Sequence, residues 1–138
     1  MDQLIEFATN HWELFAALLA TLALLLFTES RKGGSSLSTH AAVQMINKEN
    51  AAVVDIRLKK EFKTGHITNS INIPYPDMDR RIGELEKYRN RPIIIVCNLG
   101  QTASGAVKKL HDAKFANVVR LSGGITEWKG QNLPLHKD

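Results

Sequence analysis

The residue in this sequence best suited to covalent chemistry is its single cysteine, Cys97. It follows a run of branched aliphatic residues, 93–96, and precedes a loop, 98–102, that contains Gly100. A loop of this length between a strand and a helix can turn several backbone N–H groups inward and form an anion-binding nest. Such a nest would favour the thiolate of Cys97 and stabilise a persulfide anion. A second interpretation stays open, in which Cys97 is a small buried hydrophobic side chain.

Strand and helix patterns alternate on both sides of Cys97. Short runs rich in β-branched residues predict strands over 51–56, 70–73, 91–97 and 117–121. Helical spacing and a suitable cap at Ser38 predict helices over 39–48, 61–64, about 77–88, 102–113 and 125–131. The alternation predicts an α/β domain whose parallel sheet is covered by helices on both faces. In such sheets sites form beyond the carboxyl ends of strands, where Cys97 is expected.

The composition argues against several other kinds of protein. One cysteine forms neither an internal disulfide nor a cysteine-based zinc site, and the five histidines lack metal-ligand spacing, so we expect no metal. Displacement at sulfur needs no organic cofactor, so none is expected. The chain carries 18 basic and 14 acidic residues. Without an aromatic platform or a known motif, this excess does not predict nucleic-acid binding.

An apolar segment precedes the expected domain. Every residue from 14 to 27 except Thr21 is apolar, so a helix here would have no polar face. This pattern predicts a transmembrane helix within residues 1–28. Residues 12–28 alone would span only ~25 Å, so part of the upstream stretch is expected to complete the span. A cleaved signal peptide is the alternative, but the acidic start and the charged residues 29–32 argue against it.

Charges beside the apolar segment predict its orientation. Arg31 and Lys32 follow the segment and no basic residue precedes it. The positive-inside rule then places the C-terminal domain in the cytoplasm, on a single-pass anchor in the inner (cytoplasmic) membrane. Residues 29–36 are expected to form a short linker whose basic end lies near anionic headgroups, and residues 37–138 to form the domain.

Five motifs, taken in order and spacing, resemble the rhodanese family of sulfurtransferases over about residues 37–135. They are Val54-Asp55-Ile56-Arg57, Glu61-Phe62 with Gly65-His66-Ile67, Ser70-Ile71-Asn72-Ile73-Pro74, Cys97 with Gly100, and Leu121-Ser122-Gly123-Gly124-Ile125 with Trp128. The resemblance implies the rhodanese-like α/β fold with a parallel five-stranded sheet. It also implies that Cys97 is the nucleophile and that the anion is cradled by Asn98, Leu99, Gly100, Gln101 and Thr102.

Two features of this loop bear on its substrate. Relatives that bind phosphate esters use a longer loop or close it with arginine, and Thr102 stands there instead, which argues against a phosphatase. The Thr102 hydroxyl could donate a hydrogen bond to the bound sulfur. Many family members carry a cation inside the loop, whereas Asn98, Leu99 and Gln101 are uncharged. Thiosulfate is therefore expected to be a poor substrate, but the sequence leaves the donor open among thiosulfate, a small persulfide and a protein.

Other polar residues near the motifs are expected to be structural. In the family pattern Asp55 and Arg57 brace the fold near the loop, and Arg57 is also spaced for a local ion pair with Glu61. His66 lies at an expected turn and is assigned a structural role rather than that of a general base. The Gly123–Gly124 pair lacks the lysine of a phosphate-binding P-loop, so a tight turn that permits close packing is expected.

Two functions are compatible with these observations. In the first, a membrane-anchored sulfurtransferase moves a sulfane sulfur through Cys97 from a donor to a thiol acceptor, each a small molecule or a protein. In the second, a membrane-tethered rhodanese-like module binds or regulates a membrane protein and its thiol is not catalytic. The anchor motivates the second function, since sulfur transfer does not need a membrane. Arginines interleaved with acidic residues are expected on a solvated helix face, and together with three lysines they could contact acidic lipid or a partner; these residues are Arg80, Arg81, Arg89, Arg91, Lys59, Lys60 and Lys63.

Overall fold

The computed structural model describes residues 1–32 and 34–138. The chain divides into two compact units, residues 1–32 and 33–138. Gly33, within the predicted linker, lies outside the described residues, and so do the side chains of Arg31 and Lys32, on which the predicted orientation rests. The two units are therefore considered one at a time.

Two helices form the N-terminal unit, α1 (Asp2–Asn10) and α2 (Trp12–Lys32). Their axes differ by 82° across the break at His11, so the residues before Trp12 turn away from α2 instead of lengthening it. At its other end α2 continues into the predicted linker. Among the described residues no single helix has the length and hydropathy of a membrane span; only the bent pair, taken together, meets both requirements.

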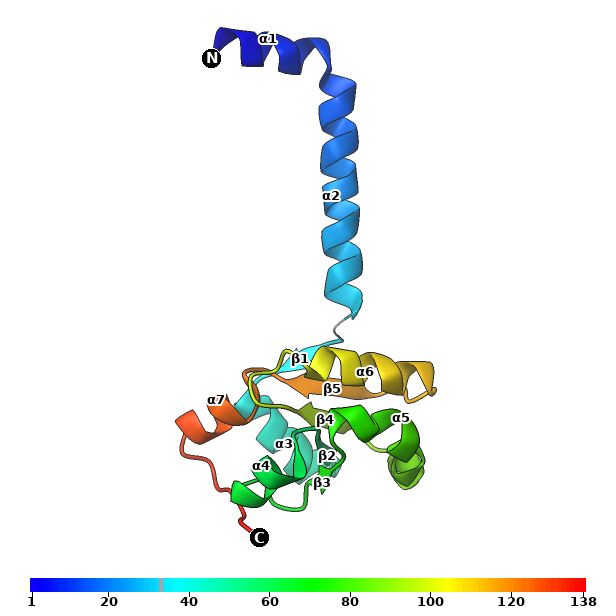
Figure 1. Ribbon diagram of the computed structural model, residues 1–138, viewed down its shortest axis with the longest axis vertical. Coiled ribbons are helices and arrows are strands. Elements are labelled where there is room, and N and C mark those ends of the chain that lie inside the picture. Colours follow the sequence, from blue (N-terminus) through cyan, green and yellow to red (C-terminus); the bar gives the residue numbers. More distant parts are fainter. Residues whose placement is uncertain (33) are drawn as a thin grey trace. The chain divides into compact units, whose positions relative to one another are not determined.

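The second unit is built on a five-stranded sheet in which every pairing is parallel (Figure 1). Its spatial order is β1-β5-β4-β2-β3. The strands are β1 (Ser36–Leu37), β2 (Ala52–Asp55), β3 (Ile71–Asn72), β4 (Ile93–Val96) and β5 (Val118–Leu121). The four expected strands and their parallel sheet are confirmed. The fifth strand, β1, comes from residues at the junction of the predicted linker and domain.

Helices connect the strands, as the alternating pattern predicts. They are α3 (Thr39–Glu49), α4 (Lys59–Thr64), the 3-10 helix η1 (Tyr75–Asp77), α5 (Met78–Arg81), the 3-10 helix η2 (Ile82–Tyr88), α6 (Ala103–Asp112) and α7 (Gly124–Gly130). The Ser38 side chain caps α3 by accepting a hydrogen bond from the Ala41 N–H, as expected. The single helix expected over about 77–88 is instead α5 followed by η2, with Gly83, a poor helix former, near the change.

Strand β4 lies in the middle of the sheet and is buried on both faces. Ile93, Ile95 and Cys97 face the core that includes side chains of α5 and α6, whereas Ile94 and Val96 face the core that includes side chains of α3 and α7. Burial on two sides explains why this strand is a continuous aliphatic run. The alternation places the Cys97 side chain on the α6 face, just beyond the carboxyl end of β4.

Candidate active site

The thiol of Cys97 lies at the edge of the core and is held by the backbone of its own loop. The residue is only 5% exposed and forms no disulfide. The Gly100 N–H donates a hydrogen bond to its Sγ at 2.9 Å. Within the described part of the chain this is the one backbone donor that reaches the sulfur, where the sequence predicted several. Cys97 thus contributes to the core, as the second interpretation held, but its sulfur also faces a backbone donor.

Gly100 adopts a backbone conformation that other residues rarely take, with φ of +91°. A Cβ at this position would lie 3.2 Å from the Gly123 nitrogen and 3.3 Å from the Leu121 carbonyl oxygen. Glycine therefore allows the loop to curl against the turn after β5 and to direct its N–H at Cys97. This supplies a local reason for a glycine in the middle of the loop.

The Gly123–Gly124 turn holds the first two residues of the loop from the other side. Both glycines have positive φ, +72° and +58°. A Cβ on Gly124 would overlap the carbonyl oxygen of Cys97. Close approach lets the Ile125 N–H donate to that oxygen at 2.8 Å and the Thr126 N–H donate to the carbonyl of Asn98 at 3.1 Å. The expected tight and closely packed turn is confirmed.

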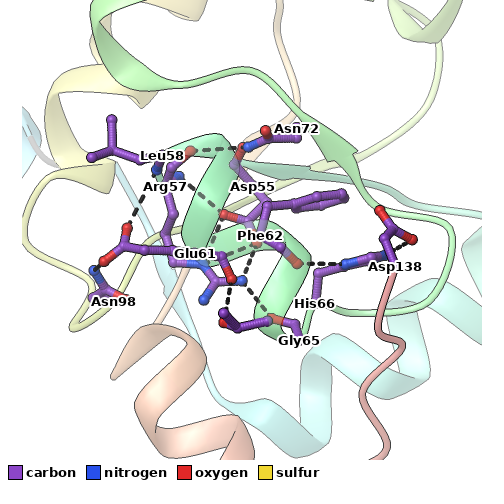
Figure 2. Close-up of polar contacts among 11 residues, drawn as sticks. Asp55, Arg57, Leu58, Glu61, Phe62, Gly65, His66, Asn72, Asn98 and Asp138 are labelled. Atoms are coloured by element: carbon purple, nitrogen blue, oxygen red, sulfur yellow. Dashed lines mark hydrogen bonds and ion pairs between the residues drawn. The ribbon is translucent and has the colours of Figure 1, made fainter.

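Glu61 ties helix α4 to the same loop, as Figure 2 shows. One of its carboxylate oxygens accepts a hydrogen bond from the Leu58 N–H at the start of α4, at 3.3 Å. The other accepts from the side-chain amide of Asn98, at 3.2 Å. A glutamate at the third position of a helix commonly reaches back to the capping N–H in this way, which positions it for Asn98. The expected ion pair between Arg57 and Glu61 is wrong, because Arg57 binds Asp55 instead.

Arg120, which the sequence reasoning missed, contacts the loop from strand β5. Its Nη1 donates to the Gly100 carbonyl at 3.2 Å, and its Nε is buried without a hydrogen-bond partner among the described residues. In a trans peptide the carbonyl and the following N–H point in opposite directions, so the Gln101 N–H points away from Arg120. The loop's own side chains are uncharged, but a cation therefore lies against its backbone. In the sequence, the only sign of this contact is the presence of an arginine within a predicted strand.

The outer residues of the loop face solvent. Leu99 is 61% exposed, and Gln101 and Thr102 are also exposed. Thr102 is the cap residue of α6, but its side chain makes no hydrogen bond to the rest of the described chain. The predicted hydrogen bond from its hydroxyl to a bound sulfur stays a prediction.

Asp55 and Arg57 form a buried ion pair at the end of β2, with side chains 1% and 2% exposed (Figure 2). The guanidinium binds both carboxylate oxygens, at 2.8 to 3.1 Å, and its Nη2 also donates to the Gly65 carbonyl at 2.7 Å. The Asn72 side chain donates to the backbone carbonyls of Asp55 and Arg57. The pair thus joins β2, β3 and the end of α4, the helix whose Glu61 contacts Asn98.

His66 is buried, with 5% of its surface exposed, and contacts helix α4 and the C-terminal segment. Its Nδ1 lies 2.8 Å from the Phe62 carbonyl oxygen, and its ring stacks on the Phe62 ring at 3.7 Å. Its backbone exchanges two hydrogen bonds with His136, and its Nε2 lies 3.9 Å from Asp138. These contacts hold the C-terminal segment against α4. The structure does not bring His66 into hydrogen-bond contact with Cys97.

Comparisons with known proteins agree with this geometry. Residues 38–131 match the family described as Rhodanese-like domain. The chain is 36% identical to the protein YibN of Escherichia coli (strain K12) over 139 residues, which cover 98% of this chain and 97% of that protein. It is 31% identical to thiosulfate sulfurtransferase GlpE of Shewanella oneidensis over 96 residues, 70% of this chain and 93% of that protein. A rhodanese-related protein from Thermoplasma volcanium superimposes with a TM-score of 0.68 at 28% identity, covering 75% of this chain and 99% of that one. The chain belongs to the rhodanese-like domain family.

Proposed function

We propose that this protein is a sulfurtransferase that moves a sulfane sulfur through a persulfide on Cys97. The observation that carries the proposal is the 2.9 Å hydrogen bond from the Gly100 N–H to Sγ, in a glycine-containing loop at the carboxyl end of the central strand. The similarity to thiosulfate sulfurtransferase GlpE over most of the second unit supports the same reaction class.

The reaction consists of two displacements at sulfur. The Cys97 thiolate attacks the outer sulfur of a donor molecule. The donor's S–S bond breaks, and the electron pair of that bond leaves with the rest of the donor, which is a thiolate if the donor is a persulfide and sulfite if it is thiosulfate. An acceptor thiolate then attacks the outer sulfur of the Cys97 persulfide, and the Cys97 thiolate is regenerated. The Gly100 N–H stabilises negative charge on Sγ before and after each transfer. No electrons are gained or lost overall, so the cycle needs no further oxidant or reductant.

The donor we favour is a persulfide rather than thiosulfate. The exposed side chains of the loop, Asn98, Leu99 and Gln101, include no cation to hold a sulfonate group. Arg120 is the cation that contacts the loop, but its hydrogen bond goes to the Gly100 carbonyl.

The N-terminal unit supports a membrane-anchored form of this enzyme. Every large apolar side chain between Trp12 and Phe27 is exposed, which is stable in lipid and unfavourable in water. The alignment with YibN covers 98% of this chain, so it includes most of this segment. We propose that α2 crosses the inner membrane once and that the domain faces the cytoplasm, where a thiol stays reduced. A protease-protection assay on spheroplasts tests this orientation, and digestion of the domain from the periplasmic side would contradict it.

Mass spectrometry of the full chain tests the sulfurtransferase proposal. After treatment with glutathione persulfide or thiosulfate in parallel, Cys97 is expected to gain the mass of one sulfur atom, with more complete loading from the persulfide. Addition of excess cysteine is expected to remove that sulfur. Cys97→Ala is the matched control and should gain nothing. Absence of an adduct with both donors would refute the proposal.

The exposed apolar residues of α2 also support the second candidate, a tethered module that binds a membrane protein. The two candidates differ in their need for the thiol. In cells that lack the protein, Cys97→Ser restores function if the module only binds, and fails to restore it if sulfur transfer is required. Removal of residues 1–28 tests the need for the anchor in the same strain.

A further inference from the structure

Two exposed leucines lie on the loop that begins at Cys97 and on the helix that contacts this loop. Leu58 is 55% exposed and Leu99 is 61% exposed, and they are the two large apolar side chains so exposed within residues 34–138. Leu99 belongs to the loop that begins at Cys97, and Leu58 is the cap residue of α4. Single exposed leucines are ordinary, but here one belongs to the loop of the nucleophile and the other begins the helix whose Glu61 binds that loop.

Glu61 links the segment of Leu58 to the segment of Leu99. Its carboxylate accepts one hydrogen bond from the Leu58 N–H and another from the side chain of Asn98, the neighbour of Leu99 (Figure 2). Hydrogen bonds therefore connect the two segments that carry these apolar side chains. Such preorganised apolar groups lower the entropic cost of binding an apolar partner.

Unpaired cations continue the same surface along α4. Lys59, Lys60 and Lys63 are exposed and form no ion pair with any described residue, unlike Arg81, which binds Glu84. Lys59 and Lys63 line a hollow of about 230 Å³ together with Phe62, Asn72, Arg81 and Asp138. A partner that covers α4 would thus meet apolar groups beside Cys97 and positive charge further along the helix.

We propose that Leu58, Leu99, Lys59, Lys60 and Lys63 form a docking surface for an acidic protein segment that carries the sulfur-exchanging cysteine. The proposal rests on the proposed sulfurtransferase function and names its partner class. Charge complementarity identifies the occupant, because three lysines without partners favour carboxylates next to an apolar contact. A hydrophilic small thiol would leave both leucines in water, and a bilayer carries no thiol to exchange sulfur with Cys97.

The burial of Cys97 bears on the shape of the partner. Because Cys97 is only 5% exposed, a cysteine on a protruding segment is better suited to reach its sulfur than one on a flat surface. The partner thiolate attacks the outer sulfur of the Cys97 persulfide, the S–S bond to Sγ breaks, and its electron pair returns to Cys97. The partner leaves as a persulfide, and loading of Cys97 by a protein persulfide is the reverse of this step.

Two synthetic peptide thiols test the docking surface. The probes are acetyl-Glu-Leu-Cys-Leu-Glu-amide and acetyl-Lys-Leu-Cys-Leu-Lys-amide, each compared with free cysteine as acceptor from the Cys97 persulfide of the full chain in neutral lipid vesicles. The measured quantity is the ratio of the peptide rate constant to the cysteine rate constant. Leu58→Ser and Lys59→Glu are the test variants, and serine is itself a favoured cap that should keep α4 folded. Lys48→Glu, an equal charge change at the end of α3, is the matched control.

For the unaltered chain the acidic peptide is expected to react about tenfold faster than the lysine peptide. Leu58→Ser should lower the acidic-peptide ratio about tenfold, because one apolar contact between the peptide and the protein is lost. Lys59→Glu should lower it similarly, and Lys48→Glu should leave it unchanged. Each ratio uses the same peptide, so the peptide's own reactivity cancels between variants.

Two outcomes would overturn the docking proposal. One is an equal ratio in the unaltered chain and in both test variants. The other is protection of Lys59 from amine labelling by anionic phosphatidylglycerol vesicles with no peptide preference, which would assign the surface to the bilayer. Failure of the sulfurtransferase proposal has a different signature, because Cys97 would then carry no sulfur to any acceptor, free cysteine included.

Discussion

Gly124 packs so closely on Cys97 that a methyl group added to this glycine would overlap the carbonyl oxygen of the cysteine. The contact brings the Ile125 N–H within 2.8 Å of the same oxygen. The turn after β5 therefore determines where the backbone of the nucleophile lies. Gly100 contributes from the other side of the loop, where its N–H contacts Sγ.

Gly124→Ala is expected to destabilise the fold and displace the loop. The added Cβ overlaps backbone, which cannot yield as a flexible side chain can, and φ of +58° is itself strained for alanine. We expect a loss of at least about 2 kcal/mol in the free energy of unfolding. We also expect a fall of at least about tenfold in persulfide transfer, the equivalent of about 1.4 kcal/mol. Urea denaturation and the transfer assay measure the two effects.

Gly130→Ala is the matched control for this substitution. Gly130 lies in the same helix, α7, and nothing lies within 4 Å of the position a Cβ would take. Alanine is a better helix former than glycine, so this variant should be as stable as the unaltered chain or slightly more so. Equal effects of the two substitutions would show that the contact with Cys97 is unimportant.

Asp55→Asn is expected to be one of the most destabilising polar substitutions in the domain. It leaves the guanidinium of Arg57 buried with a neutral partner, although the bond to the Gly65 carbonyl persists. Breaking a buried ion pair from one side typically costs about 3–5 kcal/mol. Glu84→Gln removes an exposed partner of Arg81 and should change the stability far less, because water and salt screen exposed ion pairs. Thermal denaturation of both variants checks the difference, and similar melting temperatures would contradict the bracing role.

Arg120→Met tests whether this cation positions the loop. Loss of its hydrogen bond to the Gly100 carbonyl frees the peptide that contains the Gln101 N–H, and sulfur transfer is expected to fall about tenfold. Loss of the charge should also lower the rate of Cys97 alkylation by anionic iodoacetate relative to neutral iodoacetamide. Arg120→Lys keeps the positive charge, so it should retain the rate of iodoacetate relative to iodoacetamide while it loses the guanidinium's hydrogen-bond geometry at the Gly100 carbonyl. A merely structural role would slow both reagents equally, and this result would refute the positioning role.

Strands β2 and β4 could be predicted from the sequence because a parallel strand covered on both faces needs a continuous apolar run. The Ile93–Val96 run is the clearest case. The two-residue strand β1 is too short to carry such a pattern, and its pairing with β5 depends on the rest of the sheet. The tight turn at Gly123–Gly124 was predictable as well, since glycine adopts positive φ without the steric cost that a Cβ brings.

The candidate site was only partly accessible from sequence. Cys97 and Gly100 are local features of one loop, so their relationship follows from their spacing. The contacts of Arg120 and Glu61 with the loop depend on which strand and helix lie beside it, and that is determined by long-range pairing. Spacing also misassigned the partner of Arg57. Glu61 lies four residues further along the chain, but Arg57 precedes helix α4 and shares its buried environment with Asp55.

The Glu86–Arg89 pair on the surface predicts a defined pH dependence. The hydrogen bond from Arg89 lowers the pKa of the Glu86 carboxyl below its ordinary value of about 4.5, and the same bond raises the pKa of Arg89. A carboxyl whose pKa is lower in the folded state contributes stability above its unfolded-state pKa and loses it as the pH falls through the folded-state value. Glu86→Gln should therefore lower the melting temperature slightly at pH 7 and have no effect at a pH well below 4.5. The same substitution made in an Arg89→Met background should have no pH-dependent effect, because the donor is gone; a persisting difference there would assign the effect to another group.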